Sequence, residues 1–451
     1  MLGFGVAAAC GRDEPVKAQS TAPEAKLGPD AGVESPSGDE PRRDGGPSPD
    51  AGMPADAGKE PKEEPDADAA IVPEPEPEPP TTAALTFEQL SLDAKLATDF
   101  APVPGTRDEL LVLSQSGQVT HVALEADATK TLSSVELPDV YFDEGCGLLS
   151  LTFDPGFEQN RYLYIARCSD AQTSVLARYR FAAGGGWETT GRAILTVTSD
   201  QVPAEDWHRW GSMGFEPDGE TLWVLLGDLF IRKLAQDVRH PAGSLLRLRP
   251  SRDEAEETYT PAPDNAATKL AEMADADPLI YAHGLRSPFR GARDQRGRFW
   301  VGDVGHYGAE EVNLITAAGQ NLGWATHEGP CTESCEGLVD PLLSYGRSSD
   351  EPYVREDPET APATKRAVWV GAVYEDPAVD RYYGLLNDTV IYGDHYTGWV
   401  RGVRVDEDGK LIDDRSLGNL TSVTSVRQLS DGYLYFLTLR KGLYRAVQIV
   451  D

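Results

Sequence analysis

The feature that most constrains the fold is a recurring unit in which a turn containing Asp and Gly precedes a short aromatic strand. Copies occur at 215–224, 294–301 and 429–436. Asp-Gly suits tight hairpin turns, and aromatic and β-branched residues favour strands. Turns at 114–119 and 405–411 are typical of a second hairpin in the same unit. Repeated units of this kind predict a β-propeller, in which each unit forms one blade.

Length and strand content predict six blades. Residues 85–451 divide into about six units of the roughly 50–65 residues that a loop-rich, four-stranded blade occupies. One short helical turn is expected at 266–274, so a TIM barrel, which needs many helices, is excluded. The predicted fold is all-β. Strands are predicted at 109–113, 162–165, 221–226, 298–301 and 433–437.

Residues 11–84 have a different composition. They hold seven basic and 18 acidic residues, 15 of the 33 prolines, and no Phe, Trp or Tyr. Such a segment cannot bury enough apolar surface to offset the loss of chain entropy on folding. We therefore expect a disordered, acidic, Pro-rich tail, which acts as a tether or simply as a linker.

Residues 1–10 form a short apolar stretch in which three alanines precede Cys10. This pattern resembles the lipobox of a bacterial lipoprotein and predicts a truncated signal peptide with lipid on Cys10. An accidental match is the alternative, since no basic region precedes the stretch. No apolar run reaches the ~20 residues of a membrane span, so membrane contact would come through the lipid anchor alone. We expect an exported protein of the bacterial cell envelope.

The other four cysteines suit two disulfides in an exported protein. Cys331 and Cys335 lie close enough in sequence to close a short loop, and Cys146 and Cys168 lie on either side of one predicted strand. The pairs Cys146–Cys168 and Cys331–Cys335 are therefore expected. A zinc site is the alternative, but the chain has no Cys-x-x-Cys pair and no His spacing that would complete one.

Charge and missing motifs exclude several functions. The formal net charge of −33 argues against binding to nucleic acid and against docking on anionic lipid by charge. The chain has no nucleophile elbow, P-loop or dinucleotide fingerprint. Serine hydrolase, kinase and nicotinamide chemistry are therefore not expected.

Several motifs occur in the order seen in one family. The chain resembles the soluble quinoprotein glucose and aldose sugar dehydrogenases, the glucose/sorbosone dehydrogenase family, and their hedgehog-interacting-protein-like relatives. The resemblance covers about 86–447. The segments that carry it are 147–157, 206–228, 235–248, 284–288, 302–313, 321–324 and 392–398.

The resemblance implies a six-bladed propeller with pyrroloquinoline quinone (PQQ) on its axial face. By position, His208 would be the general base that takes the hydroxyl proton while a hydride passes to the quinone. Arg286 would stabilise charge on the quinone oxygens. Further cofactor contacts are expected from Trp210, Glu144 and Ser287.

The resemblance also implies a calcium ion. Backbone oxygens of Gly305 and His306 would supply part of its site, and Glu310 and Glu311, expected on the same loop, would add carboxylates. Each residue also has a structural interpretation. His208 can be a hydrogen-bonded loop residue, and Glu310 and Glu311 can belong to a solvated loop.

The chain departs from the family pattern at three places. Gly145 stands where the family enzymes carry Gln, and Ser287 stands where they carry Asn. The cations that neutralise the quinone carboxylates are not identifiable, and Arg401 and Arg404 match only loosely.

Three functions follow as hypotheses. The first is PQQ- and calcium-dependent oxidation of an aldose or related alcohol, with the electron acceptor left open. The alternative is a non-catalytic cell-surface propeller that binds a glycan or a protein. The third is a calcium-dependent hydrolase or lactonase of the propeller type, for which the chain lacks the expected ring of acidic and Asn ligands.

Overall fold

The structure is a computed structural model that describes residues 80–449, except 93, 144, 183–185, 200–206, 255–256 and 348–365. The predicted lipobox with Cys10, nearly all of the predicted linker, and Glu144 lie outside the described residues. In the described part of the chain, no helix is long and apolar enough to cross a membrane.

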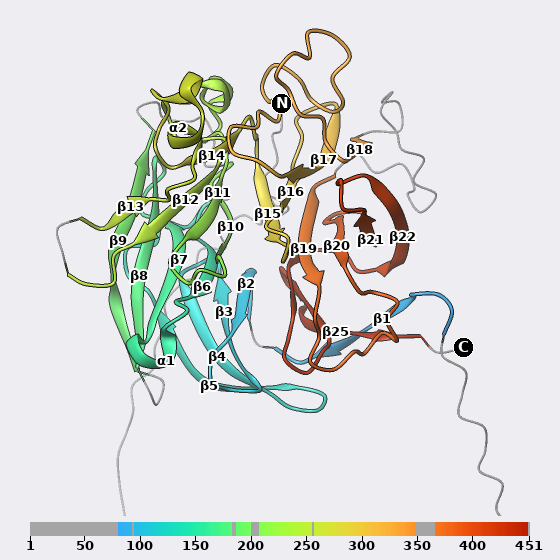
Figure 1. The fold of residues 1–451 in the computed structure, drawn as a ribbon. Helices are drawn as coiled ribbons and strands as arrows, with labels where there is room; N and C mark the ends of the chain where they lie inside the picture. Colours follow the sequence, from blue (N-terminus) through green and yellow to red (C-terminus); the bar gives the residue numbers. More distant parts are fainter. Residues whose placement is uncertain are drawn as a thin grey trace, which may run out of the picture. The chain divides into compact units, whose positions relative to one another are not determined.

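The strands form six antiparallel sheets (Figure 1). The first three blades run through the chain in order. Blade 1 contains β2 (Ala97–Pro102), β3 (Glu109–Ser114), β4 (Gln118–Leu124) and β5 (Thr129–Glu136). Blade 2 contains β6 (Leu148–Phe153), β7 (Tyr162–Cys168), β8 (Thr173–Ala182) and β9 (Gly186–Thr198). Blade 3 contains β10 (Trp210–Phe215), β11 (Leu222–Leu226), β12 (Ser244–Pro250), β13 (Tyr259–Pro261) and β14 (Ile280–His283).

The remaining blades complete the ring. Blade 4 contains β15 (Pro288–Arg293), β16 (Phe299–Asp303), β17 (Ala309–Ile315) and β18 (Leu343–Gly346). Blade 5 contains β19 (Val368–Tyr374), β20 (Thr389–Asp394), β21 (Trp399–Val405) and β22 (Leu411–Asn419). Blade 6 contains β23 (Val423–Gln428), β24 (Leu434–Thr438), β25 (Gly442–Gln448) and β1 (Leu85–Leu90).

The first strands of the blades surround the propeller axis. Each contacts the first strand of the next blade, in the cyclic order β2, β6, β10, β15, β19, β23 and back to β2. The predicted six-bladed β-propeller is therefore confirmed. The ring closes because β1, from the start of the folded chain, pairs with β25, with Leu85 opposite Gln448 and Leu90 opposite Leu443.

The inner strands approach closely enough to require glycine. A Cβ atom on Gly211 of β10 would lie 1.9 Å from the carbonyl oxygen of Pro288 in β15. Larger side chains fill the wider space between blades. Tyr164 of blade 2 and Leu222 and Leu246 of blade 3 are fully buried in one such apolar cluster.

The predicted Asp- and Gly-containing turns connect the first and second strands of blades 3, 4 and 6. Asp218 shows why Asp suits this position, because its carboxylate accepts hydrogen bonds from the backbone N–H of Glu220 and Thr221 at 3.0 and 2.9 Å. The helical turn expected at 266–274 is present as two short elements, α2 (Ala266–Lys269) and the 3₁₀ turn at Ala271–Met273.

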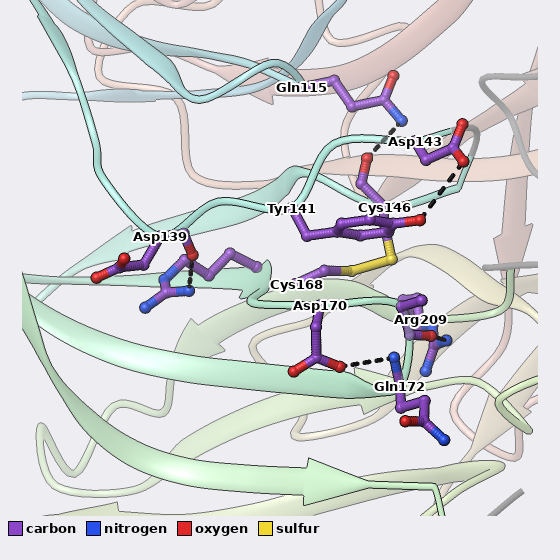
Figure 2. The surroundings of a disulfide bond; sticks show 11 residues. Gln115, Asp139, Tyr141, Asp143, Cys146, Cys168, Asp170, Gln172 and Arg209 are labelled. Atoms are coloured by element: carbon purple, nitrogen blue, oxygen red, sulfur yellow. Dashed lines mark hydrogen bonds between the residues drawn. A yellow bond between two sulfur atoms is a disulfide. The ribbon is translucent and has the colours of Figure 1, made fainter. Parts of the chain in front are cut away.

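Both expected disulfides form, between Cys146 and Cys168 and between Cys331 and Cys335. The first joins the loop that precedes β6 to the end of β7. Figure 2 shows Gln115 beside this bridge, where its side-chain amide donates a hydrogen bond to the Cys146 carbonyl oxygen at 3.0 Å. The bridge therefore holds one of the loops that reach the propeller axis.

Candidate functional site

A small cavity of about 40 Å³ lies at one end of the axis, where the inner strands begin. It brings together His208, Trp210 and Ser287, three of the residues that the sequence predicted for the site. Gly145 also lines it, beside the disulfide-held Cys146. The other lining residues are Thr98, Gln115, Leu149, Arg209, Pro288, Phe289, Thr424 and Leu439.

His208 is held by Asp228, which follows β11. His208 Nδ1 lies 2.6 Å from Oδ1 of Asp228, and the indole N–H of Trp324 donates to Oδ2 of the same carboxylate at 2.8 Å. A carboxylate can only accept hydrogen bonds, so Nδ1 of His208 carries the proton and Nε2 keeps its lone pair. Nε2 is buried and has no hydrogen-bond partner among the described residues.

The electrostatic surroundings keep His208 neutral. Burial lowers the pKa of His208 to about 4, and the positive charge of Arg286 adds to this, while Asp228 acts in the opposite direction. Burial alone would raise the pKa of Asp228, but His208 and Arg286 together hold it below its usual value. At neutral pH the pair is thus a neutral imidazole and a carboxylate, the state that a general base requires.

Arg286 lies between blades 3 and 4, just before β15. Its backbone N–H donates to Asp303 Oδ2 at 2.8 Å, and its backbone oxygen accepts from the N–H of Asp228 at 2.8 Å. Nη1 donates to the carbonyl oxygens of Val304 and Gly305, each at 2.7 Å. Asp228 thus connects the backbone of Arg286 with the imidazole of His208. The Nε of Arg286 is buried and has no partner among the described residues.

Trp324 and two further arginines belong to the same face, and the sequence analysis gave them no role. The guanidinium carbons of Arg232 and Arg286 lie 4.6 and 5.4 Å from the centre of the Trp324 ring. After burial and Arg286, the charges of Arg232 and Arg347 also lower the pKa of His306. Trp324 is part of the recognised 321–324 motif, whereas no sequence pattern singled out the two arginines.

The residues predicted to bind calcium have other partners. Glu310 and Glu311 lie in β17 and are buried, so our expectation that they share a loop with Gly305 is wrong. The carboxylate of Glu310 pairs with Arg347 and accepts from the N–H of Val368 at 2.9 Å. Glu311 accepts from the N–H of Gly329 at 2.6 Å and from Asn313 at 3.1 Å.

The backbone near Gly305 also forms hydrogen bonds to side chains of the protein. The Gly305 carbonyl oxygen accepts from Arg286, and the His306 N–H donates to Glu328. Within the described ranges, no group of three or more His, Cys, Asp or Glu side chains is placed to hold a metal ion. Calcium binding stays a prediction, and the observed donor set does not favour it.

Asp303 and Glu311 form a buried acidic pair across β16 and β17, where they are directly opposite in register. Burial raises the pKa of Asp303 to about 7 and that of Glu311 to about 8, and the charge of Asp303 contributes to the shift of Glu311. The carboxylate of Asp303 accepts hydrogen bonds from the backbone N–H groups of Arg286 and Ser287, at 2.8 and 2.6 Å, and so orients both.

Other predicted residues lie elsewhere or are more buried than expected. Trp210 is 2% exposed and packs in the apolar cluster between blades 2 and 3, so its ring face is not open for a ligand to stack on. Arg401 and Arg404 pair with Asp414 and Asp413 within blade 5 and do not supply the missing cations.

A protein-family model described as Glucose / Sorbosone dehydrogenase matches residues 96–445. The chain belongs to the glucose/sorbosone dehydrogenase family. This match spans all six blades, in agreement with the resemblance found in the sequence. His208, Asp228, Arg286 and Trp324 all lie inside the matched region.

Individual members of the family are distant. Aldose sugar dehydrogenase YliI of Escherichia coli is 24% identical over 378 residues, which cover 80% of this chain and 91% of the relative. Quinoprotein glucose dehydrogenase B of Acinetobacter calcoaceticus is 23% identical over 316 residues, which cover 63% of this chain and 61% of the relative. The PQQ-bound aldose sugar dehydrogenase of Streptomyces coelicolor superposes with a TM-score of 0.61 at 18% identity, covering 82% of this chain and 99% of the other. This structural similarity concerns the fold.

Proposed function

We propose that the protein oxidises an aldose or related alcohol with PQQ as cofactor and His208 as the general base. The observation that carries the proposal is the His208–Asp228 pair at the propeller axis. It holds a neutral imidazole whose Nε2 has no other partner among the described residues. The relatives named as aldose sugar dehydrogenase and quinoprotein glucose dehydrogenase support the substrate class.

The residues of this face fit an anionic quinone. PQQ carries carboxylates, which need dedicated cations in a chain of net charge −33. Arg232 and Arg286 lie against Trp324 and would supply two of them. Arg347 acts on the same histidine, His306, but its guanidinium already pairs with Glu310. The buried Nε of Arg286 is a hydrogen-bond donor still without a partner among the described residues. The cavity of about 40 Å³ has room for only a few water molecules, so the cofactor would have to occupy the open face next to it.

When bound, PQQ would supply the acceptor for the hydride. The chain supplies the proton chemistry and the orientation. His208 Nε2 would accept the proton of the substrate hydroxyl, and Asp228 would hold the imidazole in the required tautomer and stabilise the imidazolium. Arg286, fixed by Val304 and Gly305, would place positive charge where negative charge develops.

The proposal includes no step through calcium. The oxygens expected to bind it, on Gly305, Glu310 and Glu311, already accept hydrogen bonds from groups of the chain. The guanidinium of Arg286 at Gly305 provides positive charge at the place where the ion was expected.

We also propose that the protein is exported. Two disulfides are typical of proteins that fold outside the reducing cytoplasm, and both form here. Lipid attachment at Cys10 rests on the sequence alone.

Two measurements on the full chain test the function. The first is binding of PQQ, followed by quenching of tryptophan fluorescence, and the second is dye reduction by the PQQ-loaded protein with a panel of aldoses. Wild type is expected to bind and to reduce the dye. His208→Gln should retain quinone binding and lose at least a hundredfold in rate, the scale of general-base catalysis.

His240→Gln is the matched control, since His240 lies in the loop after Asp237 and does not line the cavity. It should behave like wild type. Quinone binding without oxidation of any aldose would leave the substrate class wrong. Absence of quinone binding would contradict the proposal that PQQ is the cofactor and would favour the alternative, a non-catalytic propeller.

A further inference from the structure

A second cavity of about 380 Å³ lies at the opposite end of the propeller axis. The same inner strands line both cavities with different residues. In β15 and the loop before it, Ser287 to Phe289 line the first cavity, whereas Arg290 to Arg293 line the second. The proposed catalytic function uses no part of this second cavity.

Arg290 separates the two cavities. Its guanidinium donates to the carbonyl oxygens of Thr98, Leu149 and Thr424 at 2.6, 3.0 and 2.5 Å, so it ties together four blades across the axis. The same three residues line the first cavity, and Arg290 lines the second. A ligand of the second cavity would therefore be bound independently of the site around His208.

One of the guanidinium groups of the second cavity has a donor without a partner among the described residues. Arg293 Nε is buried and has no hydrogen-bond partner among the described residues. Its Nη2 lies 3.6 Å from Glu216, a carboxylate that Arg247 already holds at 2.5 Å. Arg427 contributes a third guanidinium, which is bound to Asp99 on its inner side at 3.2 Å. A buried donor without a partner indicates a missing ligand or water.

The charge of the cavity wall is opposite to that of the chain. Three arginines line it, and the described residues of its lining include no Asp or Glu. The carboxylates of Asp99 and Glu216 do not line the cavity and pair with Arg427 and Arg293. In a protein of net charge −33, this concentration of positive charge is a local exception that favours an anion.

The remaining wall favours an anion with an organic body. Its lining includes the large apolar side chains of Met213, Phe215 and Trp223 and the polar residues Ser212, Ser425 and Gln428. Guanidinium groups match the two-oxygen edge of a carboxylate or a phosphate. From this combination we infer that the second cavity binds a small organic acid by its carboxylate or phosphate oxyanion.

The test is isothermal titration calorimetry of the full chain with succinate, inorganic phosphate and the uncharged succinamide, at constant ionic strength set with NaCl. Succinate or phosphate is expected to bind at one site, and succinamide should bind at least tenfold more weakly. The two anions distinguish a carboxylate ligand from a phosphate ligand. Equal heats from all three, or none from either anion, would overturn the inference.

Two variants locate the binding. Arg293→Gln removes the guanidinium with the unpartnered Nε and should weaken anion binding about tenfold or more. Ala292→Asp keeps every arginine but places a carboxylate in the wall, and should abolish binding by repulsion. Arg249→Gln is the matched control. Arg249 lies on β12, pairs with Asp218 and Glu220, and does not line the cavity.

Arg249→Gln is expected to bind like wild type. The melting temperature and near-UV circular dichroism of each variant establish that it is folded. If folded Arg293→Gln and Ala292→Asp both bind the anion with wild-type affinity, the anion binds elsewhere and the inference is wrong. Because Arg290 separates the cavities, all three variants should bind PQQ as wild type does, so this result is independent of the proposed catalytic function.

Discussion

Nδ1 of His208 lies 2.6 Å from Oδ1 of Asp228, and this hydrogen bond determines which imidazole nitrogen can accept a proton. Asp228 also accepts from Trp324 and, through Oδ1, from the N–H of Phe230 at 2.9 Å. The carboxylate therefore has a single orientation, and so has the ring that it holds. The site is built on a pair placed just before β10 begins and just after β11 ends.

Replacing Asp228 by Asn should uncouple binding from proton transfer. The Asn side chain keeps the shape but loses the charge that stabilises an imidazolium on His208. We expect kcat/KM for aldose oxidation to fall about a hundredfold or more, with PQQ binding nearly unchanged. Asp218→Asn, the same change in the surface turn of blade 3, should leave kcat/KM unaltered. Wild-type activity in Asp228→Asn would show that His208 needs no positioning residue.

The pH dependence of oxidation should report the unusual environment of His208. A base works only when deprotonated, so activity is lost as pH falls through its pKa. Burial and Arg286 lower the pKa of His208 to about 4, well below the usual 6.5. The acid limb of kcat/KM in the PQQ-loaded enzyme is expected near pH 4. A limb near pH 6.5 would mean that the base is solvated or is another group.

The Asp303–Glu311 pair should make folding stability fall with rising pH. Both pKa values are raised in the folded protein, to about 7 and about 8, so folded molecules hold protons that unfolded ones release above about pH 4.5. The free energy of unfolding should therefore decrease as pH rises towards 8.

Glu311→Gln removes one charge of this pair and keeps an acceptor for the N–H of Gly329. We expect it to be more stable than wild type at pH 8.5 by roughly 1–3 kcal/mol, and similar to wild type at pH 5. Urea unfolding at the two pH values measures the difference. Equal stabilities at pH 8.5 would show that the pair carries no excess proton.

The two disulfides should differ in their contribution to stability. Cys146–Cys168 closes a separation of 22 residues, and Cys331–Cys335 closes one of only 4. Loop-closure entropy predicts a loss of about 3 kcal/mol for Cys146→Ser/Cys168→Ser and about 2 kcal/mol or less for Cys331→Ser/Cys335→Ser. The first change should also lower oxidation rates, because Gly145 lines the cavity beside Cys146. A larger loss from the second pair in urea unfolding would contradict this order.

The sequence predicted most of the architecture because propeller turns and strands are local features. The Asp218 turn and the strand after it can be recognised from neighbouring residues alone. The arginines near His306 could not be found this way, since Arg232 and Arg347 are 115 positions apart and act on the same histidine only when blades 3 and 4 are adjacent.

Register explains the wrong placement of Glu310 and Glu311. A run of residues after Gly305 looks like a polar loop, but β17 begins at Ala309 and pairs with both β16 and β18. The two glutamates therefore enter the sheet, where Arg347 and the N–H groups of Val368 and Gly329 hold them. Partners so distant in sequence cannot be deduced from the motif itself.

The pairing of β1 with β25 has a topological consequence. The first and last described segments run side by side, and the N–H of Ile449 donates to the carbonyl oxygen of Ala84 at 2.8 Å. A short peptide could join them, and the chain could be cut instead in a turn such as the one at Gly297. A circularly permuted protein of this kind would keep every strand pairing, with the new ends in blade 4 and not in blade 6, and both new ends would be open to fusion.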